Sequence, residues 1–473
     1  MSFARHIKRN GWMLGVVIAL AATAQVYAQD NSWAGWSPGQ PGPYAIGHAS
    51  YILADSAAYD RPVAVSVFYP VDPRTINPAT PMAEYQLDPW SNHLPITTSP
   101  QWEGLGVGIS RAYEGPTPSH HAPFPLIIVS PAYTGDHWQY IFLGTSLASQ
   151  GFVVAVTDHY NEGQWPWSSI DDYMVTLFNR THDLPFVITE LLKKNVAPRE
   201  LLRGTMDPQK IAMIGHSMGG NAAYALAAGY NDFCDELWAS NYYGDPTTEP
   251  QSICVSLNQD RRIRAFVAMD GVSMNLRYDN LAKINIPSLI MGETVENSAT
   301  IPIEASSWLY RAHAAIDRRD SHRVEIQGAN HYSFTNYCEA GPLLQQLGVL
   351  QMLYDGGFLP GNDLAAWDSV FPCAGPAEAP FDPVTIAPAL AHQVVDTYVL
   401  AFLNTYFPRD DPISFYSSVR VLTPQYAIEN EPLVYFYDSE RCEVNLPSEL
   451  YSFQPVPDQC AVAQKDPAEF FAP

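Results

Sequence analysis

The chain has 473 residues, of which 47% are hydrophobic and 16% charged, with 25 lysine and arginine residues against 49 aspartate and glutamate residues. The net charge of −24 argues against nucleic acid or an anionic membrane surface as a partner, because like charges repel. The length would permit about three domains. We expect one large domain instead, because 40 prolines and 29 glycines indicate long loops within it.

The N-terminus has the pattern of a secretory signal peptide over residues 1–28. Three basic residues between positions 5 and 9 precede an apolar run over 12–22, and small residues offer a cleavage point after Ala28. That run is shorter than the roughly 20 apolar residues of a membrane-spanning helix, and no later segment reaches that length. We therefore predict a secreted or periplasmic protein with no integral membrane segment after signal removal.

Apolar runs and helical patterns alternate along the chain. Residues 44–70 read as two paired strands with a turn at Asp60–Pro62, and a proline-rich stretch then extends to 123. Buried strands are expected at 126–129, 152–157, 211–214, 265–269 and 288–291, and residues 323–326 have a strand-like pattern. Helices are expected at 138–149, at 171–195 with an interruption near Pro185, at 221–228 and at 388–407. This alternation predicts an α/β fold with a mostly parallel sheet, whose active site lies at the carboxyl ends of the strands.

One strand-to-helix junction carries the sequence Gly215-His216-Ser217-Met218-Gly219. In such a turn the serine backbone is strained, and the flanking glycines let strand and helix approach closely. The result is a nucleophile elbow, in which the Ser217 hydroxyl stands above the first amides of a helix. A serine becomes a strong nucleophile only when a base takes its proton and a carboxylate orients that base.

The candidate base is His331, which follows the strand 323–326 in a turn that contains Gly328 and Asn330. Two other histidines, His313 and His322, lie on helical or charged stretches and are expected to be solvated. A last candidate, His392, lies inside the helix expected at 388–407.

The acid has two main candidates. Asp270 directly follows the strand 265–269, whereas Glu296 lies on the loop after the strand 288–291, with Glu293 as a weaker third choice. Hydrolases of this architecture use both places. We favour Asp270 and leave Glu296 open.

The tetrahedral intermediate needs two backbone donors for its oxyanion. Elbow geometry assigns one of them to the Met218 amide. The second should come from the loop after the strand 126–129, and we assign it to Tyr133 because Pro131 has no N–H.

Segments around these residues carry a resemblance. Ser130-Pro-Ala-Tyr-Thr-Gly135 and the following 147–159 resemble platelet-activating-factor acetylhydrolases and bacterial cutinase-like polyester hydrolases. The likeness to the acetylhydrolases continues at 262–271, 284–293 and 326–331. The resemblance implies an α/β-hydrolase fold and hydrolysis of carboxylic esters, with Ser217, Asp270 and His331 as the triad.

The chain also departs from these families. The acetylhydrolases carry His-Gly where this chain has Pro131-Ala132. Pro131-Ala132 is closer to the Pro-Gly-Tyr of the polyester enzymes, and Met218 after the serine also favours those enzymes. The polyester enzymes, however, take their acid from the later loop. The chain also resembles the group labelled dienelactone hydrolases, whose true members use a cysteine nucleophile, so Ser217 favours ester chemistry.

We divide the chain into a signal peptide at 1–28, an α/β-hydrolase catalytic domain at 29–409 and a C-terminal extension at 410–473 that packs on the domain. An insertion at 230–260 is either a lid or an inert surface loop. Six cysteines without CxxC spacing favour disulfide bonds, and sequence neighbours suggest one pairing among the 15 that are possible, so the connectivity is left open. They are Cys234, Cys254, Cys338, Cys373, Cys442 and Cys460.

These observations predict a secreted serine esterase that cleaves short-acyl lipids or similar esters and so takes part in lipid degradation. The alternatives are a cutinase-like polyester hydrolase and an inactive hydrolase fold that binds ligands. Neither a metal nor a cofactor is expected, because His120 and His121 lack a third ligand nearby and no glycine-rich phosphate loop appears. The ester substrate and the oligomeric state are left open.

Overall fold

The computed structural model describes residues 41–55, 59–86, 106, 109, 111–133, 135–160, 170–229, 259–273, 276, 278–293, 309, 312–313, 315–340, 386–408, 412–431 and 434–438. The predicted signal peptide, residues 230–258 of the predicted insertion and Glu296 lie outside these residues. Cys338 is disulfide-bonded, and the other five cysteines lie outside the described residues, so their pairing stays a prediction.

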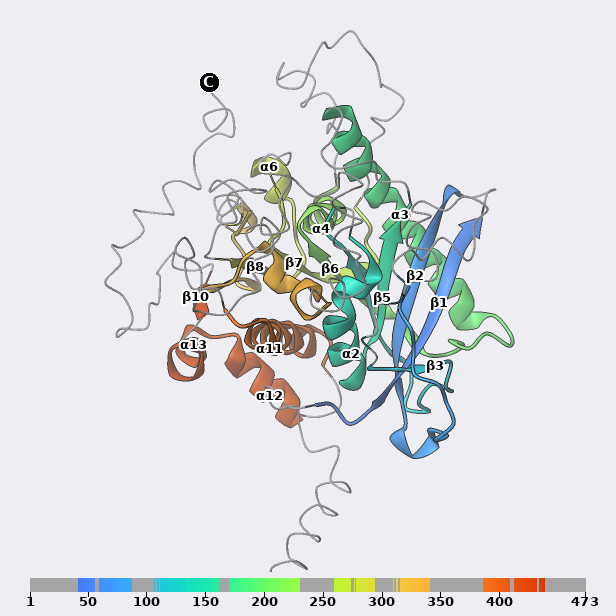
Figure 1. Ribbon diagram of the computed structural model, residues 1–473. Helices are drawn as coiled ribbons and strands as arrows, with labels where there is room; N and C mark the ends of the chain where they lie inside the picture. Colours follow the sequence, from blue (N-terminus) through green and yellow to red (C-terminus); the bar gives the residue numbers. More distant parts are fainter. Residues whose placement is uncertain are drawn as a thin grey trace, which may run out of the picture.

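A ten-stranded sheet runs through the molecule in the order β10-β9-β8-β7-β6-β4-β5-β2-β1-β3 (Figure 1). Its strands are β1 (Ala45–Asp55), β2 (Tyr59–Val71), β3 (Tyr113–Glu114), β4 (Phe124–Ser130), β5 (Val153–His159), β6 (Met206–His216), β7 (Ile263–Met269), β8 (Ser288–Glu293), β9 (Ser321–Ile326) and β10 (Val434–Asp438). From β5 through β4 to β9 all neighbours are parallel, whereas β2 is antiparallel to β5 and to β1, and β10 is antiparallel to β9. The predicted mostly parallel sheet is therefore confirmed.

Helices cover both faces of the sheet (Figure 1). They are α2 (Ile141–Ser149), α3 (Ile170–Val196), α4 (Met218–Ala228), α6 (Tyr278–Leu281), α11 (Pro388–Tyr406), α12 (Pro412–Val421) and α13 (Pro424–Asn430), with short 3-10 turns η1 (Pro73–Thr75), η3 (His137–Tyr140) and η4 (His331–Phe334). Successive strand residues point to opposite faces. In β4, Ile127 packs with α2 and α11 in one core, and Ile128 packs with α3 and α4 in the other. Burial on both faces explains why the central strands read as continuous apolar runs.

The predicted turn at Asp60–Pro62 is wrong, because these residues lie inside β2. Leu53 pairs with Val63 and Asp55 pairs with Tyr59, so the register shifts and three residues of β2 face one residue of β1. Proline is tolerated at such an irregularity because its missing N–H costs no ladder hydrogen bond. The turn signal therefore marked a break in the pairing.

The predicted interruption of the helix at Pro185 is also wrong, because α3 continues through this residue. Proline removes one backbone hydrogen bond from a helix interior. Leu184, Val187 and Ile188, which surround Pro185, are each at most 1% exposed against the sheet. This burial holds the helix together across the proline.

The described part of the predicted C-terminal extension forms α12, α13 and β10. β10 pairs with β9 in the register Val434 to Ile326, and its Phe436 is buried in the core shared with α11. This segment therefore supplies an edge strand of the central sheet. Among the described residues, none of the helices is both long and apolar enough to cross a membrane.

One buried carboxyl group on α11 makes the stability of the fold dependent on pH. Burial raises the pKa of Asp396 to about 8, although a hydrogen bond with Ser146 and the charge of Arg111 act in the other direction. The pKa in the unfolded chain is about 4. Because the folded state holds this proton more tightly, the contribution of Asp396 to stability is greatest at acid pH and falls as the pH rises from about 4 to about 8.

We therefore expect Asp396→Asn to raise the free energy of unfolding by up to about 5 kcal/mol at pH 8, at about 1.4 kcal/mol per pKa unit, and to change it little at pH 4. Urea unfolding of wild type and variant at the two pH values measures this difference. Glu429→Gln on the exposed face of α13 is the matched control, with no expected gain at either pH. An equal gain at both pH values would contradict the role of Asp396.

Candidate active site

Ser217 occupies the turn between β6 and α4 with a φ of 55° and a ψ of −116°. A Cβ on Gly215 would lie 2.0 Å from the carbonyl oxygen of Gly219, and a Cβ on Gly219 would lie 2.0 Å from the carbonyl oxygen of Ser130. Only glycine fits at either position. The strained serine between two obligatory glycines is the geometry of a nucleophile elbow.

The elbow is joined to the end of β7 by backbone hydrogen bonds. The Ser217 N–H donates to the Met269 carbonyl at 3.0 Å, and the Val272 N–H donates to the Ser217 carbonyl at 3.1 Å. Asp270 lies between these two residues with a φ of 44°, and its N–H donates to the Met291 carbonyl at 2.7 Å. The backbone thus holds Asp270 beside the elbow at the carboxyl end of the parallel strands.

His331 opens the turn η4 and forms a short hydrogen bond from its Nδ1 to Asp270 Oδ2. Asn330 orients this turn, because its side chain accepts hydrogen bonds from the N–H groups of Tyr332 and Ser333. The side chains of Asp270 and His331 are 3% and 8% exposed, so the pair is shielded from water. A carboxylate on Nδ1 fixes the tautomer whose Nε2 can accept a proton.

The structure therefore brings Asp270 and His331 together, and backbone hydrogen bonds tie the Asp270 segment to Ser217. The His331 ring is also 4.5 Å, centroid to centroid, from the ring of His216, the residue before the serine. Of the alternative acids, Glu293 ends β8 and is buried, whereas Glu296 lies outside the described residues.

The expectation that His313 and His322 are solvated is wrong, because they are only 7% and 9% exposed. Burial lowers the pKa of His313 to about 3, with a smaller contribution from the charge of Arg323. His322 lies on β9 beside Phe436 of β10. Charged residues near a histidine are typical of a solvated face, but Tyr406 of α11 also contacts His322, and His313 contacts the Ser321 carbonyl.

His216 is a further residue of the site that sequence reasoning did not assign. Its Nδ1 lies 2.8 Å from the Tyr140 hydroxyl, which accepts a hydrogen bond from the Ala132 N–H at 2.8 Å. Burial, followed by the charge of His331, lowers the pKa of His216 well below its usual value, so the ring stays neutral. His216 thus links the elbow to the loop after β4, and its place inside the glycine motif was the available signal.

The loop after β4 carries the predicted oxyanion donor Tyr133. The Ala132 N–H donates to the Tyr140 hydroxyl, which argues against Ala132 as the oxyanion donor. The next amide along the loop belongs to Tyr133, a half-buried residue. The Gly135 N–H donates to the Ala132 carbonyl at 2.9 Å and closes the loop. Met218 begins α4 and is 2% exposed.

Within the described part of the chain, one group of side chains could supply three metal ligands. Atoms of His216, Asp270 and His331 lie within 4.8 Å of one another. Asp270 and His331 are already joined by a hydrogen bond, and Tyr140 contacts His216. A metal ion here would compete with the hydrogen bonds that orient His331.

Known proteins resemble this chain over its central part. Residues 112–269 match the dienelactone hydrolase family. Cutinase 1 of Thermobifida cellulosilytica is 21% identical over 216 residues, which cover 46% of this chain and 63% of the cutinase. A cutinase of Thermobifida fusca is also 21% identical over 216 residues, which cover 46% of this chain and 55% of that protein. The chain is similar to bacterial cutinases.

Chlorophyllase type 0 of Chenopodium album is 24% identical over 318 residues, which cover 64% of this chain and 77% of the chlorophyllase. The solved structure of a ferulic acid esterase from Streptomyces cinnamoneus aligns with a TM-score of 0.46 and 20% identity, covering 80% of this chain and 94% of the esterase. The family match and the sheet order together identify an α/β-hydrolase fold. The likeness to cutinases agrees with the resemblance that the sequence motifs indicate.

Proposed function

We propose that the protein is a secreted serine esterase that hydrolyses carboxylic esters through an acyl-enzyme intermediate. The observation that carries this proposal is the hydrogen bond between His331 Nδ1 and Asp270 Oδ2 beside a strained Ser217. This arrangement supplies a base in the correct tautomer at the same edge of the sheet as the nucleophile elbow. Secretion rests on the signal pattern at 1–28.

In the proposed reaction, Ser217 Oγ attacks the ester carbonyl carbon while its proton passes to His331 Nε2. The Tyr133 and Met218 amides hold the oxyanion of the tetrahedral intermediate. His331 then gives its proton to the leaving alkoxide oxygen as the carbon–oxygen bond breaks, which releases the alcohol. Water repeats these steps on the acyl-enzyme and releases the acid. Asp270 stabilises the imidazolium at each stage.

The substrate we favour is a short-acyl lipid or a similar small ester. A polyester is the second candidate, supported by the likeness to cutinases and by Pro131 and Met218, which match the polyester enzymes in the motifs. Hydrolysis rates on a panel of 4-nitrophenyl esters, short-acyl phospholipid and polyester film distinguish the two candidates. Release of soluble acid from the film at a rate comparable to the small esters would favour the second.

The test of the proposed function is covalent labelling with a fluorophosphonate probe. We expect one label per chain on the peptide that contains Ser217, located by mass spectrometry, together with loss of ester hydrolysis in proportion to labelling. Heat-unfolded protein serves as the control and should not react. A folded protein that does not react would instead support the inactive, ligand-binding alternative.

A further inference from the structure

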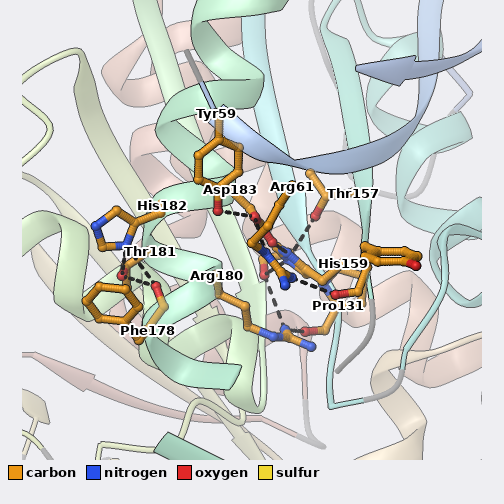
Figure 2. A network of polar contacts seen from close by, with 12 residues as sticks. Tyr59, Arg61, Pro131, Thr157, His159, Phe178, Arg180, Thr181, His182 and Asp183 are labelled. Atoms are coloured by element: carbon orange, nitrogen blue, oxygen red, sulfur yellow. Dashed lines mark hydrogen bonds and ion pairs between the residues drawn. The ribbon is translucent and has the colours of Figure 1, made fainter. Parts of the chain in front are cut away.

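A buried arginine from α3 reaches the loop that follows β4 (Figure 2). Arg180 is 0% exposed, and its Nη2 donates a hydrogen bond to the Ala132 carbonyl at 2.8 Å. Its Nη1 donates to the Pro131 carbonyl and, at 3.3 Å, to Ser130 Oγ. Burying a guanidinium is costly unless its N–H groups are satisfied. Two successive backbone carbonyls and one hydroxyl accept hydrogen bonds from this buried cation.

These contacts fix the direction of the next amide. The Ala132 carbonyl and the Tyr133 N–H belong to one peptide unit, and in a planar trans peptide the two groups point in opposite directions. Arg180 and the Gly135 N–H hold the Ala132 carbonyl on one side. The Tyr133 N–H therefore points to the other side, away from the guanidinium.

The loop starts directly against the elbow. A Cβ on Gly219 would lie 2.0 Å from the Ser130 carbonyl oxygen and 2.7 Å from that of Pro131, so the end of β4 touches the start of α4. A rotation of the peptide unit between Ala132 and Tyr133 would replace the Tyr133 N–H donor by the Ala132 carbonyl acceptor. The carbonyl would then repel an oxyanion that the N–H stabilises.

Arg180 is itself held by a chain of buried polar groups (Figure 2). Ser130 Oγ, which accepts from Arg180, lies 3.0 Å from His159 Nε2, and His159 Nδ1 lies 2.8 Å from Asp183 Oδ2. Asp183 follows Arg180 by three residues on α3, so both side chains lie on one helix face. Ser130 is 0% exposed, so this second serine, histidine and aspartate set orients the arginine and does not serve as a second nucleophile.

The carboxylate at the far end of this chain stays ionised. Burial raises the pKa of Asp183, but the hydrogen bonds from His159 and Tyr59 and the charge of Arg61 outweigh it, so the pKa is lowered overall. Tyr59 donates a further hydrogen bond to Asp183 at 2.5 Å, and Arg61 donates one at 3.3 Å. An ionised Asp183 accepts from His159 Nδ1, which leaves Nε2 to accept from Ser130.

We propose that Arg180 is a positioning residue that holds the Tyr133 amide in the oxyanion hole. This inference rests on the proposed function and identifies a residue outside the triad that acts on the same step. The planar fork of a guanidinium binds two adjacent carbonyls at once, whereas a lysine ammonium is a single point charge. Arginine is therefore needed for its shape as well as its charge.

The test compares wild type with Arg180→Lys, which keeps the charge but loses one of the two carbonyl contacts. We expect kcat for 4-nitrophenyl acetate to fall about 100-fold, the loss typical of one missing oxyanion donor, while KM changes less than about threefold. A trifluoromethyl ketone forms its oxyanion when Ser217 adds to its carbonyl carbon, so its inhibition constant should rise by a similar factor. The matched control is Arg262→Lys, since Arg262 donates to the Pro185 carbonyl on the same helix, away from the loop. It should leave kcat and ketone affinity unchanged.

If Arg180→Lys does not fold, as judged by its circular dichroism, Ser130→Ala takes its place. This variant removes the hydroxyl that joins Arg180 to His159 and should lower kcat and ketone affinity together by several-fold. The inference is overturned if kcat stays within twofold of wild type, or if kcat falls without any loss of ketone affinity. A wild type that neither hydrolyses esters nor reacts with a fluorophosphonate overturns the proposed function, and this inference with it.

Discussion

Replacement of Ser217 by alanine is expected to lower kcat/KM for 4-nitrophenyl acetate by about 10⁴-fold or more. The variant loses the only oxygen that could form the acyl-enzyme in the proposed reaction. Oxyanion donors and substrate binding would remain, so a small residual rate above the uncatalysed reaction is compatible with the proposal. Initial rates at saturating and subsaturating ester measure the loss, with wild-type sites counted by the fluorophosphonate label and the variant quantified by protein concentration.

Alanine keeps the Cβ of Ser217 and therefore keeps the positive φ of 55° and its strain. The thermal midpoint should accordingly stay close to that of wild type, which separates loss of chemistry from loss of folding. The matched control is Ser288→Ala. Ser288 is equally small and fully buried, but it begins β8 at the opposite end of the strands and contacts Ser321 at 2.8 Å. Full activity in Ser217→Ala would refute the assignment of the nucleophile.

Replacement of Asp270 by asparagine is expected to lower kcat by about 10³- to 10⁴-fold near neutral pH, as loss of the triad acid does in serine proteases. An asparagine amide can donate to His331 Nδ1 and so place the ring proton on Nε2. That tautomer cannot accept the proton of Ser217. The imidazolium formed in the reaction would also lose the carboxylate that stabilises it.

Glu296→Gln is the decisive comparison, because it makes the same chemical change at the rival acid. We expect its kcat to stay within about threefold of wild type, since in our proposal His331 is oriented by Asp270 alone. Parallel kcat measurements on both variants and on the double variant are sufficient. A collapse of activity in Glu296→Gln with Asp270→Asn unaffected would transfer the role of the acid to the later loop.

Local patterns in the sequence predicted most of the architecture. Apolar runs at 126–129, 211–214 and 265–269 predicted strands β4, β6 and β7, because strands buried on both faces leave no room for polar side chains. The two glycines around Ser217 predicted the elbow, because backbone approaches within 2.0 Å of a Cβ exclude every other residue. Each of these signals is contained in a few consecutive residues.

The predictions at two prolines are wrong because tertiary packing outweighs the local preference of proline to end a helix or form a turn. Pro185 stays inside α3 because the helix is buried against the sheet on either side of it. Pro62 stays inside β2 because the register of the pairing leaves its missing N–H without a cost. A sequence pattern alone does not tell how much burial surrounds a proline.

The sequence by itself determined the elbow, the mostly parallel sheet and the residue types that a hydrolase site requires. Only the tertiary structure decided which polar groups meet. Asp270 and His331 are 61 residues apart and are joined because β7 and the turn after β9 end at the same edge of the sheet. Arg180 reaches the Ala132 carbonyl, 48 residues away, because α3 packs across β4. Such pairings depend on strand order and helix packing, which no short window of sequence contains.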